Sequence, residues 1–303
     1  MLTIHAQPSL RSPVLLCAVS GWSDAGSAAS GALRYLLRKR PSQRIADFDP
    51  DAIFSYPVTR PITTFASPGH RVLHWPELGW HALVVPDAPH DLVLLVGPEP
   101  DLRWREAVEA VAGYAQQLGV VQVITLGAFY AAVHYTSPPP VLGFSPDVAL
   151  RERLHQLGVR DSDYEGPTGF VTAVLNAVSG RGIPAASLWV AAPAYLQNVT
   201  NPKLAAALLS LVERTIGQDL WLTELEAAGR DAEQRIAEAL KTRPEMLALL
   251  ERLAEAATET PEPRREEEQQ GELPSAADVL KDLEDYLHRS QDKGPGEQGG
   301  AIE

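Results

Sequence analysis

The sequence is short of the residues that cross-link a chain or chelate metals. It has 1 cysteine and 2 methionines among 303 residues. The lone Cys17 excludes an intrachain disulfide or a multi-cysteine zinc site, and a single cysteine is typical of a reducing compartment. Because Cys17 lies in an apolar strand-like run, we expect an inert core thiol. The 8 histidines are scattered, without His-x-x-x-His or His-Glu-x-x-His spacing, so we predict no metal site and no cofactor.

Long apolar runs and basic stretches are also missing. No run approaches the ~20 apolar residues of a membrane span, and residues 1–14 lack a basic start followed by an apolar segment. We therefore expect a cytoplasmic protein that neither crosses a membrane nor is secreted. The net charge is −13, and residues 258–303 hold 13 acidic and 5 basic side chains. With no basic stripe for phosphate backbones, nucleic acid is not an expected partner.

The common catalytic signatures are absent as well. Residues 21–26 do not form the Gly-x-Ser-x-Gly elbow, no P-loop motif occurs, and no Gly-x-Gly-x-x-Gly follows the first strand. A triad of Ser23, His134 and Asp24 can be drawn, but adjacent Ser23 and Asp24 would point in different directions from their turn. We assign no catalytic residue, and an enzyme is the less favoured class of protein.

Strand-like and helix-like segments alternate along the chain. Helical patterns cover 25–38, 103–118, 147–156, 168–180 and 202–216. Apolar runs of strand length occur at 14–19, 81–85, 91–96, 120–127 and 186–192, with shorter candidates at 45–48, 62–66, 71–75 and 140–144. This alternation predicts an α/β fold of three layers, with a mixed or parallel sheet between helices. Residues 40–90 hold short strands and few helices, a pattern that favours an antiparallel extension of the sheet.

The most informative segment is the strand-to-helix turn within residues 14–37. An uninterrupted apolar run at 14–19 suits a strand covered on both faces. Ser23 and Asp24 then stand where a helix N-cap belongs, and Gly21 and Gly26 allow a sharp turn. Turns of this kind build sites at the carboxyl ends of strands in α/β folds. A capped turn without any ligand is the plain alternative.

The C-terminal third has a different composition. We divide the chain into an α/β domain (1–217), a helical hairpin (218–257), an acidic linker (258–275), a helix (276–290) and a disordered tail (291–303). The linker is charged and proline-rich. The helix after it carries an apolar stripe and is too short to be stable alone in water. It either folds back on its own hairpin or binds a neighbouring subunit, and we favour docking within an oligomer.

Four loops are expected to meet at the carboxyl edge of the sheet. They are 20–26, 97–104, 127–136 and 163–169. Carboxylates, a histidine and aromatic side chains at such an edge are typical of a small-molecule site. The ligand-binding candidates that they supply are Ser23, Asp24, Glu99, His134, Glu165 and Thr168.

Each candidate also has a structural explanation. Asp24 and Asp101 are suited to capping helices, and Thr168 could cap the helix that follows it. The free N–H groups of that helix could instead bind an anion.

Several segments resemble the PAC2 family, which includes proteasome assembly chaperones and their bacterial relatives. Residues 21–36 (GWSDAGSAASGALRYL) resemble its opening signature, and 48–61 (FDPDAIFSYPVTRP) and 94–104 (LLVGPEPDLRW) resemble two further blocks. The remaining similar blocks are 164–170, 201–209 and 278–289. The resemblance implies a phosphorylase/hydrolase-like α/β fold, a protein partner and homo-oligomerisation, with a homotrimer as the expected state.

The sequence departs from the family at three points. The hydrophobic–Tyr–any tail by which some members engage the proteasome is not present at Ala301-Ile302-Glu303. An arginine is missing from 133–138, and Ala194 stands where relatives tend to have histidine. Two functions remain open: a non-enzymatic protein-binding factor of assembly-chaperone or adaptor type, and a small-molecule-binding protein or enzyme with a pocket at the carboxyl edge of the sheet.

Overall fold

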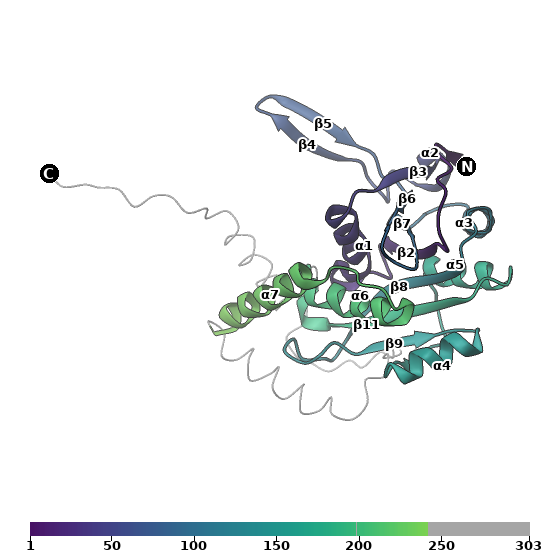
Figure 1. Cartoon of the computed structure of the whole chain (residues 1–303). Coiled ribbons are helices and arrows are strands. Elements are labelled where there is room, and N and C mark those ends of the chain that lie inside the picture. Colours follow the sequence, from purple (N-terminus) through teal and green to yellow (C-terminus); the bar gives the residue numbers. More distant parts are fainter. Residues whose placement is uncertain (198, 242–303) are drawn as a thin grey trace.

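A nine-stranded mixed sheet forms the centre of the protein. The computed structural model describes residues 1–197 and 199–241. In spatial order the strands of the sheet are β1 (Leu2–Ile4), β3 (Gln43–Phe48), β6 (Gly79–Leu83), β7 (Leu92–Pro98), β2 (Val14–Ser20), β8 (Gln122–Ala131), β11 (Ala185–Pro193), β9 (Val141–Phe144) and β10 (Arg160–Asp161). Figure 1 shows these strands between the helices.

The middle of the sheet is parallel and one flank is antiparallel. Strands β7, β2, β8 and β11 run parallel to one another. On one side, β6 and β3 continue the sheet with antiparallel pairs, as the short-strand pattern of residues 40–90 predicted, and β1 pairs antiparallel with β3 beyond them. On the other side, β9 pairs antiparallel with β11, and β10 pairs parallel with β9. The sheet therefore ends in a strand of 3 residues on one side and of 2 on the other.

Helices cover both faces of the sheet, so the predicted three-layer α/β fold is confirmed. Helices α1 (Ala28–Lys39) and α6 (Pro202–Ile216) pack on one face. Helices α3 (Trp104–Gln117) and α5 (Phe170–Ser179) pack on the other. Because both faces are buried, the central strands are apolar throughout rather than alternating. Successive side chains of β2 point to opposite faces of the sheet, so Leu16 faces α1 and α6, and Cys17 faces α3 and α5.

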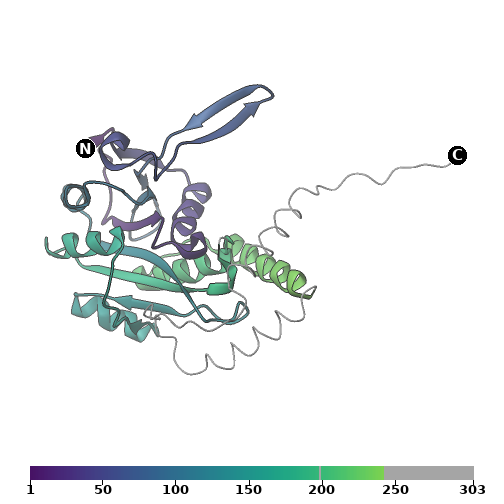
Figure 2. The ribbon, with the colours of Figure 1, turned by 180° about the vertical axis from the view of Figure 1, so that it is seen from behind.

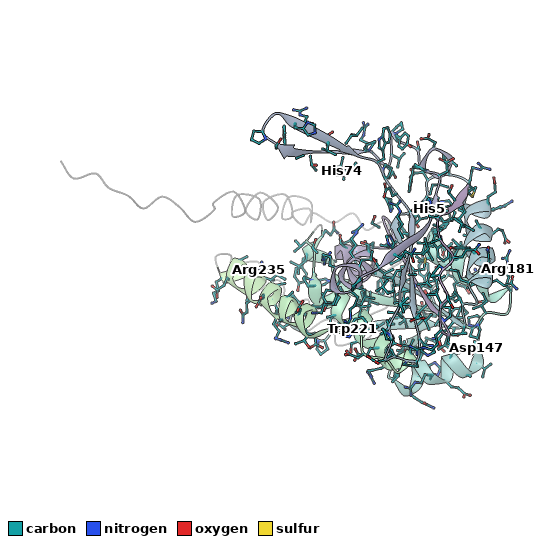
Figure 3. The ribbon with its side chains drawn as sticks, turned by 45° about the horizontal axis from the view of Figure 1, so that its top comes forward. His5, His74, Asp147, Arg181, Trp221 and Arg235 are labelled. Carbon is teal, nitrogen blue, oxygen red and sulfur yellow. The ribbon has the colours of Figure 1, made fainter. Side chains whose placement is uncertain are left out.

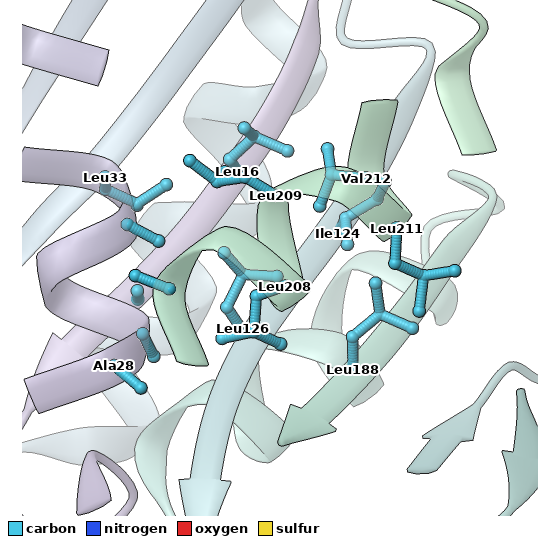
Figure 4. Close-up of a cluster of buried hydrophobic side chains, with 14 of the residues drawn as sticks. Leu16, Ala28, Leu33, Ile124, Leu126, Leu188, Leu208, Leu209, Leu211 and Val212 are labelled. Atoms are coloured by element: carbon cyan, nitrogen blue, oxygen red, sulfur yellow. The ribbon is translucent and has the colours of Figure 1, made fainter. Parts of the chain in front are cut away.

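The core on the α6 side is built from aliphatic side chains. Figure 4 shows Leu208, Leu209 and Val212 of α6 directed at the sheet. They meet Leu16 of β2 and Ile124 of β8, which are fully buried. Burying a leucine side chain contributes about 2 kcal/mol, so these contacts fix α6 against the sheet.

Three further helices lie at the periphery. They are α2 (Pro50–Ile53), α4 (Val148–Gln156) and α7 (Thr223–Lys241), and α7 packs against α6. The helix α7 lies in the first half of the predicted hairpin. The second half of that hairpin, the linker, the helix at 276–290 and the tail lie outside the described residues.

Some boundaries differ from the sequence prediction. The helix expected from residue 25 begins with a 3-10 turn (Ala25–Ser27), and α1 itself starts at Ala28. A second 3-10 turn (Ala194–Leu196) follows β11. The elements β1, α2 and β10 were not predicted, because segments of 2 to 4 residues carry too little periodicity.

Two strands from residues 40–90 leave the sheet altogether. Strands β4 (Ile62–Ser67) and β5 (His70–His74) were expected to extend the sheet, but they pair only with each other. They form a hairpin that projects from the body, which Figure 2 shows from behind. We call this hairpin, residues 62–74, the arm. Its exposed side chains supply no packing against the main sheet, which explains why it stands apart.

Candidate functional site

The carboxyl ends of β7, β2 and β8 meet at one edge of the sheet. The loops after these strands lie side by side, and Asp24 forms an isolated parallel bridge with Ala128 of β8. Two glycines shape the turn after β2, since Gly21 and Gly26 have φ angles of 143° and 61°. The predicted convergence of loops is therefore present for residues 20–26 and 97–104.

Asp24 acts as the cap of α1. Its Oδ1 accepts hydrogen bonds from the backbone N–H groups of Ala29 (2.8 Å) and Ser30 (3.1 Å). Its Oδ2 accepts from the Ser30 hydroxyl at 2.5 Å. The residue directly before the helix, Ser27, has φ 51° and makes no side-chain cap. Burial raises the pKa of the Asp24 carboxyl, and the bonds from Ser30 and Ala29 partly oppose that shift.

The Glu99 carboxylate caps the N-terminus of α5. Its Oε1 accepts a hydrogen bond from the Phe170 backbone N–H at 2.7 Å, and the Trp22 N–H also donates to its carboxylate. Burial raises the pKa of Glu99, whereas these two backbone donors lower it. A helix N-terminus attracts anions through its free N–H groups. At α5 the anion is supplied by the chain itself.

Close packing seals the space around Glu99. A Cβ atom at Gly169 would come within 3.1 Å of Ser23 Oγ and 3.3 Å of Glu99 Oε1. Ser23 is 1% exposed, and its hydroxyl has no hydrogen-bond partner. The loops after β2 and β7 and the start of α5 are thus joined in one compact polar contact.

The remaining candidates lie elsewhere. His134 is half-buried, and its Nδ1 bonds the Thr136 hydroxyl at 2.7 Å. With Asn201 and Lys203 it lines a small pocket that includes none of the other candidates. Glu165 and Thr168 are exposed. Thr168 does not cap α5, because the cap residue is Gly169 and the capping carboxylate comes from Glu99.

The structure does not assemble the Ser23, His134 and Asp24 triad. The Ser23 hydroxyl is unpartnered, His134 is bonded to Thr136, and Asp24 is bonded to α1. Among the described residues, no group of three or more histidine, cysteine, aspartate or glutamate side chains could hold a metal ion. That any of the six candidates binds a ligand stays a prediction.

Lys203 was not singled out from the sequence. Its ammonium lies 2.8 Å from Tyr135 O, 3.0 Å from Thr136 O and 2.5 Å from Glu233 Oε2. It therefore joins the loop after β8 to α6 and α7. A lysine near the start of a helix gives no sequence signal for such a role, because both of its partner segments are distant in the chain.

Exposed apolar side chains stand around the same carboxyl edge. Trp22 follows β2 and is 63% exposed, Leu102 follows β7 and is 45% exposed, and Tyr164 precedes α5 and is 48% exposed. We call these three residues the edge surface. Glu99 bonds the backbone of both Trp22 and Phe170, so the loop of Trp22 and the start of α5 are held together. Exposed tryptophan and tyrosine side chains are typical of protein-binding surfaces.

Comparisons with known proteins agree on one family. A sequence model described as the PAC2 family matches residues 18–240. A PAC2 family protein from Streptomyces avermitilis is 35% identical, with a TM-score of 0.68 over 75% of this chain and 95% of that one. A proteasome-assembly chaperone homologue from Mycobacterium tuberculosis is 34% identical, with a TM-score of 0.68 over 74% of this chain and 94% of that one.

A more distant likeness extends to archaea. An archaeal proteasome activator from Pyrococcus furiosus is 18% identical, with a TM-score of 0.62 over 78% of this chain and 97% of that one, which shows a shared fold. No curated protein matches the chain. Among the helices that the structure describes, none is long and apolar enough to cross a bilayer.

Proposed function

Because this chain belongs to the PAC2 family, we propose that it is a non-enzymatic protein-binding factor that acts as an assembly chaperone or adaptor. It works in the cytoplasm and binds another protein through the edge surface. The names of its relatives make a proteasome subunit the first partner to test.

The observation that carries the proposal is the position of Glu99. An α/β fold binds small ligands where loops at the carboxyl edge leave backbone N–H groups free. In this protein the Glu99 carboxylate already accepts from the N–H groups of Phe170 and Trp22. Asp24 is likewise bonded to the first turn of α1. The polar groups of the edge therefore support its loops, which leaves the apolar side chains above them for recognition.

The edge surface has the chemistry of a protein contact. Tryptophan and tyrosine carry much of the binding energy at protein interfaces, and truncating such a residue at the centre costs about 2 kcal/mol or more. Trp22 and Tyr164 are both exposed, and the loops that carry them are braced by Glu99 and, at Tyr164, by a hydroxyl bond to Pro167 O at 3.0 Å. Braced aromatic side chains lose little entropy on binding.

The experiment is a quantitative affinity capture with the full chain as bait in its source organism. Wild type is compared with Trp22→Ala/Tyr164→Ala and with the control Val84→Ala/Val148→Ala, which removes exposed apolar side chains away from this edge. We expect partners, proteasome subunits first, that are reduced at least tenfold with the edge variant and unchanged with the control. Equal capture by all three baits would overturn the proposal.

A thermal-shift screen tests the small-molecule alternative directly. Nucleotides, sugars, amino acids and polyamines are added to the full chain and to Glu99→Gln. A ligand at 100 times its dissociation constant adds about 2.7 kcal/mol, which raises the midpoint by several degrees. A shift that Glu99→Gln abolishes would overturn the non-enzymatic proposal, and a flat screen supports it. No contact among the described residues favours the alternative.

A further inference from the structure

The edge surface stands among negative charges. The three loops that carry it, residues 20–26, 97–104 and 163–169, hold five acidic residues and a single arginine. This arginine, Arg103, already has a partner within the chain, because its guanidinium donates to both carboxylate oxygens of Glu106, to one of them at 2.9 Å. The three loops therefore present a negative charge that no cation of their own balances.

Two of the five acidic residues are free to bind a partner. Asp163 and Glu165 stand on either side of Tyr164 in the sequence, and both are exposed. Neither carboxylate forms a hydrogen bond or an ion pair with a described residue. The guanidinium of Arg151 pairs with Asp161, two residues before Asp163. An unpaired carboxylate thus flanks each side of an exposed tyrosine of the edge surface.

The other three acidic residues are held by backbone N–H groups. Asp24 and Glu99 cap helices. Asp101 Oδ2 accepts a hydrogen bond from the Ser55 N–H at 2.8 Å. These bonds fix the loops on which Trp22 and Leu102 stand, and they leave Asp163 and Glu165 as the carboxylates that a partner can reach.

The turn around Tyr164 is fixed within the chain itself. The Tyr164 hydroxyl donates to Pro167 O at 3.0 Å and so closes the turn. A Cβ atom at Gly166 would lie 2.6 Å from that hydroxyl, so a larger residue at this position would displace the tyrosine side chain. The two free carboxylates therefore flank a side chain of defined position, and a surface that is ordered in advance loses little entropy on binding.

Lysine and arginine side chains match this combination of groups. Their cationic heads pair with carboxylates and stack on the faces of tryptophan and tyrosine, and their apolar stems pack on aliphatic side chains. The edge surface supplies two aromatic rings and one aliphatic side chain, and the carboxylates of Asp163 and Glu165 lie beside them. An acidic segment would be repelled by the same charges.

From these observations we propose that the edge surface recognises a basic segment of its partner, one that carries lysine or arginine next to apolar residues. The proposal rests on the function proposed above and names the chemistry of the partner at the same surface. Burial of Trp22 and Tyr164 supplies affinity, and the free carboxylates select the sign of the charge. Because exposed charges are screened by ions, the association weakens as salt rises.

Two labelled peptides of equal length test the sign of the charge. One alternates lysine with leucine, the other alternates glutamate with leucine, and fluorescence anisotropy measures their binding to the full chain. We expect the lysine peptide to bind with an affinity that falls as salt rises, and the glutamate peptide to bind at least tenfold more weakly. Equal binding of the two peptides, or no binding of the lysine peptide, would overturn the proposal.

Variants of matched charge locate the binding site. Asp163→Lys/Glu165→Lys alters the edge, and Asp87→Lys/Asp231→Lys makes the same change in net charge at exposed acidic residues elsewhere. Asp231 lies one turn before Arg235, which Figure 3 shows on the part of α7 that projects from the body. We expect the edge variant to bind the lysine peptide at least tenfold more weakly and the glutamate peptide more tightly, and the control to match wild type within twofold. Equal losses in both variants would show a response to net charge alone and would overturn the proposal.

The affinity capture separates this inference from the proposed function. Asp163→Lys/Glu165→Lys is added as a bait beside Trp22→Ala/Tyr164→Ala. Loss of the same partner with both baits, together with crosslinks from the edge to a lysine- or arginine-rich segment of that partner, supports the inference. A partner that only the aromatic variant loses leaves the proposed function standing and contradicts the inference. A partner that neither bait loses contradicts both.

Discussion

At the scale of single residues, the carboxyl edge depends on two carboxylates that serve as helix caps, the buried Asp24 and the half-buried Glu99. Asp24 caps α1 from within the preceding turn, and Glu99 caps α5 from a different strand. Both have a raised pKa because burial disfavours their charged forms. Hydrogen bonds from backbone N–H groups partly oppose this increase in each pKa. Their first role is therefore structural, and their substitution acts on folding.

Asp24→Ala should destabilise the protein without removing a ligand. The change leaves the N–H groups of Ala29 and Ser30 without their acceptor, so we expect a loss of about 2 kcal/mol. Asp24→Asn keeps an acceptor oxygen and should lose less than half of that. Urea unfolding of the three proteins measures the difference. Equal stability of wild type and Asp24→Ala would contradict the capping role.

The raised pKa of Glu99 predicts how the stability of the fold depends on pH. Its folded pKa lies above its ordinary value of 4.5, so the folded state holds the proton more tightly than the unfolded state. The group therefore contributes most to stability below pH 4.5, and that contribution is lost as pH rises through the folded pKa. We expect wild type to lose stability relative to Glu99→Gln across this range.

Denaturant unfolding of both proteins at several pH values above and below 4.5 is the measurement. Thr168→Ala at the same loop is a matched control, since its side chain is exposed and does not cap α5. If wild type instead gained stability over Glu99→Gln with rising pH, the two backbone donors would outweigh burial, and the pKa of Glu99 would be lowered by folding rather than raised.

At the scale of elements, Lys203 ties three segments together. Lys203→Met removes the bonds to Tyr135 O, Thr136 O and Glu233 while keeping a long apolar side chain. We expect faster hydrogen exchange in α7 and in residues 133–137, with a local cost of about 1–3 kcal/mol. Lys241→Met is the control, because its ion pair with Glu238 is exposed and such pairs contribute little. Unchanged protection in α7 would contradict this role.

The central elements could be predicted because their patterns are long. The apolar runs of β2, β7, β8 and β11 and the periodicity of α6 carry the architecture, and all of them appear where expected. The arm could not be placed, since alternation identifies a strand but not its neighbour. Strands β4 and β5 together carry β-branched residues as a sheet strand does, yet all of their side chains except Val72 are exposed.

The candidate site was harder to predict because the residues that contact each other there are far apart in the sequence. Which loops meet follows from the parallel strands, so Ser23 and Glu99 were correctly placed at one edge. That Glu99 caps α5 was not visible, because its partner Phe170 is 71 residues away in the chain. In the sequence, a loop carboxylate that binds a ligand cannot be distinguished from one that caps a distant helix.

At the scale of the whole molecule, Cys17 reports on global unfolding. It lies in the middle of β2, between β7 and β8, and is fully buried. Burial raises its pKa to about 12, so the reactive thiolate is scarce in the folded state. We expect thiol labelling in native buffer to follow the free energy of global unfolding and to accelerate with denaturant. Rapid labelling that denaturant does not change would contradict the burial of β2.

The shortness of the terminal strands limits how the protein aggregates. Strands β1 and β10, of 3 and 2 residues, offer too little backbone for a second sheet to add to the first. A chain with nine strands in its sheet is thereby protected from growing into fibres through that sheet. The long open strand edges within the described residues belong to the arm. These edges are therefore the described part of the sheet structure from which chain-to-chain pairing could begin, so a proline that blocks β4 or β5 should reduce precipitation.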